Sequence, residues 1–103
     1  MKLKHATWRA LMNFRNFGGT GPSVSEVGLG CWQLGGDWGD VDDYTAQKVL
    51  EAAVQNGINF YDTADVYGKG RSEALLHKYL RPLAPGAFIA TKLGRFPEPG
   101  NSE

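Results

Sequence analysis

The 103-residue sequence has little cysteine, no surplus of either charge and no long apolar run. Its single cysteine, Cys31, excludes a disulfide within the chain and suits a reducing cytoplasm. Eleven basic residues balance eleven acidic ones, so we expect no nucleic-acid partner. No apolar run approaches the ~18 residues of a membrane span, so we expect no membrane association either. One cysteine and two histidines cannot form a conventional zinc site.

The first twelve residues form a basic segment without the continuous apolar core of a secretory signal. We interpret residues 1–12 as a disordered or misassigned extension, and residues 13–103 as the folded part. Nothing in either part identifies a protein partner. The cluster of glycines at 18–21, followed by Pro22, predicts a turn, and the flanking residues predict a short hairpin over 13–26.

Three strands and two helices are expected to follow the hairpin. The strands are predicted at 27–30, 58–62 and 87–92, and the last is apolar on both faces, as a covered parallel strand should be. The first helix runs from a cap at Asp42 or Asp43 to about Asn56. The second is capped by Ser72 and ends before Pro82. Their predicted inner faces are Ala46, Val49, Leu50, Ala53 and Val54, and Leu75, Leu76, Tyr79 and Leu80.

The alternation of strands and helices predicts an α/β fold with a parallel sheet. In such a sheet the carboxyl ends of all strands lie at one edge, where α/β folds place their chemistry. Gly30, Asp62 and Lys92 each stand at the carboxyl end of a predicted strand, and Tyr67 follows Asp62 by five residues. We therefore expect these residues to meet at one rim.

A carboxylate, a phenol and an ammonium at one rim can act together as a proton donor. Free tyrosine titrates near ~10 and is a poor acid at pH 7, but a nearby ammonium favours the phenolate. A carboxylate paired with the ammonium keeps that ammonium charged and in place. The spacing alone leaves the ordinary alternatives open, namely a turn-forming aspartate, a packing tyrosine and a solvated lysine.

Three blocks of sequence resemble the aldo-keto reductase family. They are VSEVGLGCWQLGG at 24–36, GINFYDTADVYG at 57–68 with GRSE at 70–73, and FIATK at 88–92. The blocks occur in the family's order. The resemblance implies the N-terminal fragment of a (β/α)8 TIM barrel, with about three parallel strands alternating with two helices after the hairpin. A complete barrel typically needs ~250 residues, so we expect a domain truncated at its C-terminus.

The resemblance also implies roles for individual residues. Tyr67 would be the general acid, Lys92 its electrostatic partner, and Asp62 the residue that pairs with Lys92 and borders the nicotinamide ribose. The nicotinamide end of NADP(H) would be lined by Gly30, Cys31 and Trp32. For Trp32 the alternative that its side chain simply packs over the rim of the barrel is equally possible. The implied reaction is hydride transfer from NADPH to a small aldehyde or ketone.

The family's fourth catalytic member, a histidine after the next strand, has no counterpart, since His5 and His77 lie elsewhere. A non-catalytic, truncated remnant is therefore the alternative for function, and a flavodoxin-like binding domain is the alternative for fold. Two common nucleotide-binding motifs are absent from the sequence. Gln33 stands where a dinucleotide fingerprint needs its third glycine, and no P-loop run occurs.

Overall fold

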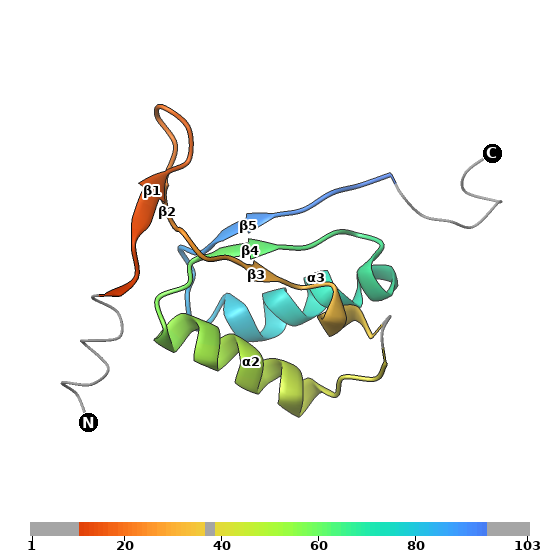
Figure 1. Ribbon diagram of the computed structural model, residues 1–103. Helices are drawn as coiled ribbons and strands as arrows, with labels where there is room; N and C mark the ends of the chain where they lie inside the picture. The colour runs from red at the N-terminus through yellow and green to blue at the C-terminus, as the bar shows by residue number, and fades with distance from the viewer. Residues whose placement is uncertain (1–10, 37–38, 95–103) are drawn as a thin grey trace, which may run out of the picture.

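The computed structural model describes residues 11–36 and 39–94, which form a small parallel sheet with helices on one face and a hairpin at one end (Figure 1). Residues 1–10 of the predicted extension at 1–12, and residues 37–38 and 95–103, lie outside the described residues. No helix in the described part of the chain is long and apolar enough to cross a membrane.

The hairpin is formed as predicted. Strands β1 (Phe14–Asn16) and β2 (Ser23–Ser25) pair antiparallel, and the amide of Phe17 donates to the carbonyl of Pro22 across the turn at 2.8 Å. The ring of Phe17 lies 4.8 Å from that of Phe88 and 6.1 Å from that of Phe60, measured between centroids. The hairpin therefore covers aromatic side chains of the parallel sheet.

The parallel sheet has the predicted order. Strands β3 (Leu29–Gly30), β4 (Phe60–Asp62) and β5 (Phe88–Ala90) lie side by side, with β4 in the middle. Gly30 is in register with Asp62, and Asp62 with Ala90. The prediction that all three strands run in the same direction is confirmed.

Strand β4 begins two residues later than predicted because Asn59 bonds to the hairpin. Its Oδ1 accepts from the amide of Ser25 at 2.7 Å, and its Nδ2 donates to the carbonyl of Ser23 at 2.9 Å. The backbone amide of Asn59 donates to Ser25 Oγ at 3.1 Å. The carbonyl of Asn59 still accepts from the amide of Phe88 at 2.7 Å, so backbone pairing with the β5 side continues at this point. Strand propensity contains no information on the side-chain bonds to the hairpin, so it could not place the boundary.

Helix α2 (Asp43–Gln55) begins where the sequence predicted. The side chain of Asp42 caps it by accepting a hydrogen bond from the amide of Thr45 at 2.8 Å. Of the predicted inner face, Ala46, Leu50 and Ala53 are buried and Val54 packs against the core. Val49 was wrongly assigned to that face, since 39% of its surface is exposed.

The second helix is composite. A short 3-10 turn, η2 (Tyr67–Gly70), leads into α3 (Arg71–Leu75), which continues as a π-helical turn, η3 (Leu76–Leu80). The prediction that Ser72 caps this helix is wrong, because Gly70 occupies the cap position and Ser72 is fully buried within the helix. The predicted inner face is largely confirmed, with Leu75, Leu76 and Leu80 buried and Tyr79 packed at its margin.

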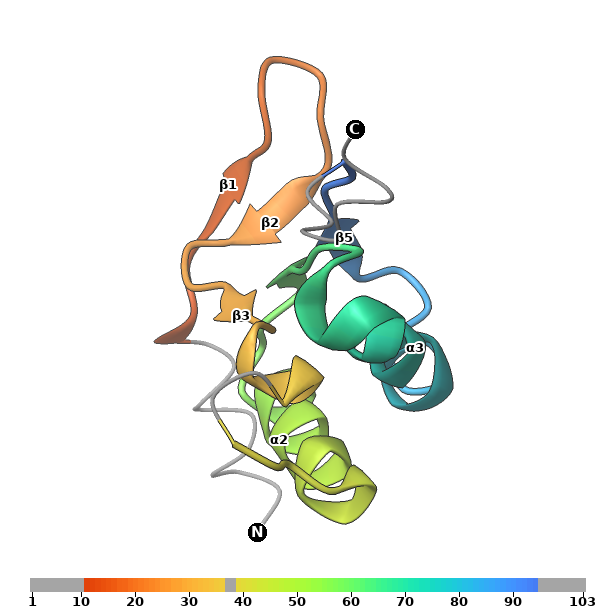
Figure 2. The same cartoon turned by 90° about the vertical axis from the view of Figure 1, so that its right-hand side faces the viewer.

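Helices α2 and α3 both lie on one face of the sheet (Figures 1 and 2). Tyr61 of β4 is completely buried under them, and Leu29 and Ile89 of the neighbouring strands pack against the same core. The expectation of a buried first strand and of a third strand covered on both faces is wrong for the described residues. Val27 is 55% exposed, and β5 is only partly buried. The helices cover one face only, and the hairpin covers only one end of the other.

The core position of α2 generates a stability prediction. Replacing Leu50, which has no exposed surface, with Ala should lower the free energy of unfolding by about 2–5 kcal/mol. Val49→Ala on the same helix should change it by less than about 0.5 kcal/mol, because that side chain reaches solvent. Urea denaturation followed by far-UV circular dichroism measures both. Equal losses in the two variants would contradict the assigned packing face.

Candidate active site at the carboxyl ends of the strands

The structure brings Asp62 and Lys92 together at the carboxyl ends of β4 and β5. Lys92 Nζ lies 3.0 and 3.1 Å from the two carboxylate oxygens of Asp62, and it also donates to the carbonyl oxygen of Thr63 at 2.7 Å. An ammonium has three donors, so these acceptors fix its position from one side. The ion pair faces solvent, with 45% of the Lys92 side chain and 51% of the Asp62 side chain exposed.

Tyr67 lies next to this ion pair. It is the first residue of η2, and its ring centroid is 5.3 Å from Lys92 Nζ. The indole of Trp32 lies near the Tyr67 ring, with 6.5 Å between the two ring centroids. The carboxylate, the phenol and the ammonium therefore form one cluster, contributed by the last residue of β4, the loop that follows it and the segment after β5.

The charges in the cluster favour a protonated lysine. The hydrogen bond that Lys92 donates to Asp62 raises the pKa of Lys92 above its ordinary value, although desolvation opposes the rise, and the charge of Asp62 and the proximity of Tyr67 add to it. An exposed ion pair contributes little to folding, because water and salt screen it. The pair is therefore better suited to holding an ammonium at the rim than to stabilising the fold.

The two loops that carry the cluster stay paired beyond the strands. The amide of Thr63 donates to the carbonyl of Ala90 at 2.8 Å, and the amide of Asp65 donates to the carbonyl of Lys92 at 3.0 Å. Both bonds continue the direction of the β4–β5 ladder. The position of Lys92 relative to Asp62 is therefore set by backbone pairing as well as by the ion pair.

A close contact between two glycines places the Tyr67 loop against the loop after β3. A Cβ atom on Gly68 would lie 2.2 Å from the carbonyl oxygen of Gly35, and one on Gly35 would lie 2.6 Å from the amide nitrogen of Gly68. Gly68 also has a positive φ of 62°. No larger residue fits at either position without moving one of the loops.

Two buried hydroxyls connect three segments beneath the rim. Ser72 Oγ donates to the carbonyl of Cys31 at 2.8 Å and lies 2.8 Å from Thr63 Oγ1. Both hydroxyl residues are fully buried. Sequence reasoning missed this network because Ser72 resembled a helix cap. The period of two along the strand was the available signal, since it turns Tyr61 and Thr63 inward and leaves Asp62 at the rim.

The three residues predicted to line a cofactor differ in their access to solvent. Gly30 and Trp32 are exposed, and nothing lies within 4 Å of where a Cβ on Gly30 would stand. Cys31 has no exposed surface, and burial raises the pKa of its thiol to about 12, with the charge of Asp62 adding to the rise. In this structure Cys31 therefore presents no exposed surface to a cofactor.

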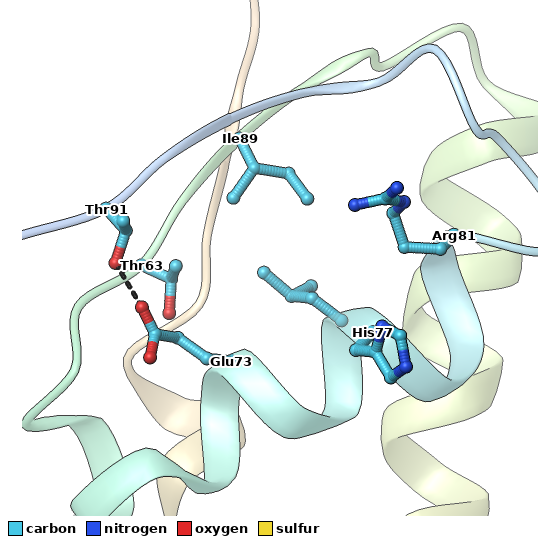
Figure 3. A pocket seen from close by; sticks show the side chains of 7 residues that line it. Thr63, Glu73, His77, Arg81, Ile89 and Thr91 are labelled. Carbon is cyan, nitrogen blue, oxygen red and sulfur yellow. Dashed lines mark hydrogen bonds between the residues drawn. The ribbon is translucent and has the colours of Figure 1, made fainter.

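His77 belongs to a different part of the molecule. It lines a pocket of about 150 Å³ between α3 and β5, together with the residues drawn in Figure 3. Leu76 and Ile89 form the apolar part of this pocket, and Thr91 Oγ1 donates to Glu73 at its edge. Thr63 and Thr91 point into the pocket, whereas their chain neighbours Asp62 and Lys92 form the rim cluster. Among residues 11–36 and 39–94, no group of three His, Cys, Asp or Glu side chains could hold a metal ion.

Comparisons with known proteins agree on one family. Residues 26–103 match the model of the aldo/keto reductase family. The chain is 42% identical over 95 residues to pyridoxal 4-dehydrogenase from Microbacterium luteolum, which covers 92% of this chain and 26% of that protein. It is 38% identical over 71 residues to aldo-keto reductase YhdN from Bacillus subtilis, covering 68% of this chain and 22% of the relative.

Solved structures give the same result. Aldo-keto reductase AKR11C1 from Bacillus halodurans, in its holo form, superposes with a TM-score of 0.70 at 34% identity, covering 81% of this chain and 26% of that one. A putative aldo-keto reductase from Pseudomonas aeruginosa gives a TM-score of 0.71 at 39% identity, covering 84% and 33%. These structures are (β/α)8 barrels, so the described fold is part of such a barrel. The chain spans about a quarter of the length of the curated relatives it matches.

The glycine contact predicts a difference between two similar substitutions. Gly68→Ala and Gly70→Ala both place a side chain at positive φ, 62° and 102°, but only the first meets the Gly35 backbone. The overlap should cost Gly68→Ala at least about 1 kcal/mol of unfolding free energy more than its control. It should also shift the NMR signals of Tyr67, which Gly70→Ala should shift much less. Equal effects on stability and on Tyr67 would exclude the proposed close approach.

The ion pair predicts the titration of Lys92. Asp62→Asn should lower the pKa of Lys92 toward its ordinary value, because the strongest cause of the rise is removed. Asp43→Asn, whose carboxylate contacts Lys78 instead, should leave Lys92 unchanged. Because the pKa of Lys92 is raised in the folded state, the small stabilising contribution of the pair is present below the unfolded pKa of 10.5 and is lost as pH rises through the folded value. The measurement is a ¹³Cε NMR titration, and an unchanged Lys92 pKa in Asp62→Asn is the contrary result.

Proposed function

Because the chain belongs to the aldo/keto reductase family, we propose that its rim cluster protonates a carbonyl oxygen during NADPH-dependent reduction of a small aldehyde or ketone. Members of this family act on small carbonyl substrates. The observation that carries the proposal is the contact of Lys92 with both Asp62 and Tyr67, at 3.0 Å from the carboxylate and 5.3 Å from the ring centroid.

Tyr67 is the proton donor in this proposal. Lys92 is a weaker acid than an ordinary lysine because Asp62 raises its pKa, and its donors are already directed at Asp62 and Thr63. Tyr67 gives its phenol proton to the carbonyl oxygen, and the nearby ammonium stabilises the negative charge left on the phenol oxygen. Asp62 keeps Lys92 charged and in position.

The residues around the cluster suit a flat cofactor ring. The space above Gly30 is open, Trp32 presents an exposed aromatic surface, and the carboxylate of Asp62 faces solvent in register with Gly30. In the proposal Gly30 and Trp32 contact the nicotinamide end and Asp62 borders its ribose. When bound, NADPH supplies the hydride that reaches the carbonyl carbon. The assignment of NADPH rather than NADH is part of the proposal.

The catalytic role is tested in a barrel that contains the remaining strands. Residues 13–94 replace the matching segment of aldo-keto reductase YhdN, and carbonyl-dependent NADPH oxidation is measured with a panel that includes pyridoxal. Tyr67→Phe should lower kcat by about 10²–10⁴-fold, because general acid catalysis contributes that much. Tyr44→Phe, on the exposed face of α2, should match the unsubstituted chimera. An active chimera in which Tyr67→Phe turns over normally would remove Tyr67 as the donor.

The 103 residues alone should bind NADPH weakly. Barrels of this kind bind phosphate with loops after strands seven and eight, and the described sheet has three strands. We expect a Kd above about 10 μM, which corresponds to a binding free energy of about −7 kcal/mol. Isothermal titration calorimetry of the purified chain measures it. Tighter binding would show that the segment carries a cofactor site of its own.

A further inference from the structure

Asp65 connects the loop that carries Tyr67 to the segment that carries Lys92. Its amide donates to the carbonyl of Lys92 at 3.0 Å, and its Oδ2 accepts a hydrogen bond from the amide of Gly94 at 3.3 Å. The same residue therefore holds the backbone immediately at Lys92 and two residues beyond it. Neither of these two hydrogen bonds involves the Lys92 ammonium.

The backbone geometry explains why a side chain is needed here. After Asp65 the first loop turns into η2, where the amide of Tyr67 bonds locally to the carbonyl of Ala64 at 3.3 Å. The backbone of that loop therefore no longer follows the segment after β5. The carboxylate of Asp65 supplies the acceptor that a continuing strand would have offered to Gly94.

The carboxylate of Asp65 is poorly suited to a purely structural role. Its second oxygen, Oδ1, is buried and has no hydrogen-bond partner among the described residues. A buried polar atom without a partner is costly, and a charged one more so. Buried polar atoms that lack a hydrogen-bond partner concentrate at functional sites, where another requirement outweighs stability. The requirement that the contacts indicate is the placement of Lys92.

We propose that Asp65 is a positioning residue for the reductase reaction, strapping the Lys92–Gly94 backbone to the Tyr67 loop so that the ammonium stays beside the phenol. The inference rests on the proposed function. In this role Asp65 acts through the backbone of Lys92 and Gly94, and the proposal requires no contact of Asp65 with substrate or cofactor. Its effect is exerted through the distance between Lys92 and Tyr67, to which proton transfer is sensitive because misplacement by about 1 Å can cost about 10²-fold in rate.

Three variants of the YhdN chimera test whether Asp65 positions Lys92. Asp65→Ala removes the acceptor and should lower kcat by about 10–100-fold while the KM for NADPH changes less than about 3-fold. Asp65→Asn keeps an oxygen acceptor for Gly94 and should retain kcat within about 3-fold of the parent. Gly94→Ala disturbs the same bond from its other partner, since Gly94 has a φ of 90°, and should resemble Asp65→Ala. Glu51→Ala on α2 is the control, and circular dichroism checks the folding of each variant.

The outcomes separate the strap from the proposed function. A reduced kcat in Asp65→Ala and Gly94→Ala, together with a kcat close to that of the parent in Asp65→Asn, supports the positioning role of Asp65. A normal kcat in folded Asp65→Ala, or an effect on KM alone, overturns it. A folded Asp65→Asn whose kcat falls more than about 10-fold below that of the parent chimera also overturns it, and this result is decisive even if Asp65→Ala fails to fold. Failure of the proposed function appears elsewhere, as normal turnover in Tyr67→Phe. Amide exchange of Gly94 in the 103-residue chain, faster in Asp65→Ala than in Asp65→Asn, checks the hydrogen bond without any activity.

Discussion

Parallel pairing of β4 with β5 is the constraint on which the site depends. The pairing puts the carboxyl ends of both strands at the same edge, so that Asp62 and Lys92 meet although thirty residues separate them. An antiparallel arrangement would place the two side chains at opposite ends of the sheet. The crossover through α3 supports this pairing, because its buried leucines fasten the helix to one face and leave the other face and the rim open.

The rim is assembled in layers of decreasing burial. The lowest layer is the core around Tyr61 and Leu50, and above it the buried hydroxyls of Thr63 and Ser72 join the ends of β3, β4 and α3. The upper layer consists of loops held by backbone bonds and by the contact of Gly35 with Gly68. The exposed charges rest on these layers and contribute little to them. Chemistry at the rim can therefore vary without loss of the fold.

The sequence allowed the element order, the parallel sheet and the meeting of Asp62 with Lys92 to be predicted, because hydrophobic period and strand direction determine them. It did not place Ser72 or Asn59 correctly. Both bond to partners more than thirty residues away, and local propensity contains no information on such partners. Val49 illustrates a related difficulty, because an apolar residue at the edge of a helix's apolar face can be exposed although it fits the helical period. Asp65 and the Gly35–Gly68 contact depend on two loops approaching each other, which only coordinates reveal.

The proposed chemistry requires that the Lys92 ammonium, held by Asp62, lies against the ring of Tyr67. Nuclear Overhauser contacts between the Lys92 side-chain methylenes and the Tyr67 ring protons measure this arrangement directly in the purified chain. We expect cross-peaks between the Lys92 ε-protons and the Tyr67 ring protons, and weaker cross-peaks in Asp62→Asn. A spectrum in which the assigned Lys92 signals show contacts to other residues but none to Tyr67 would contradict this arrangement.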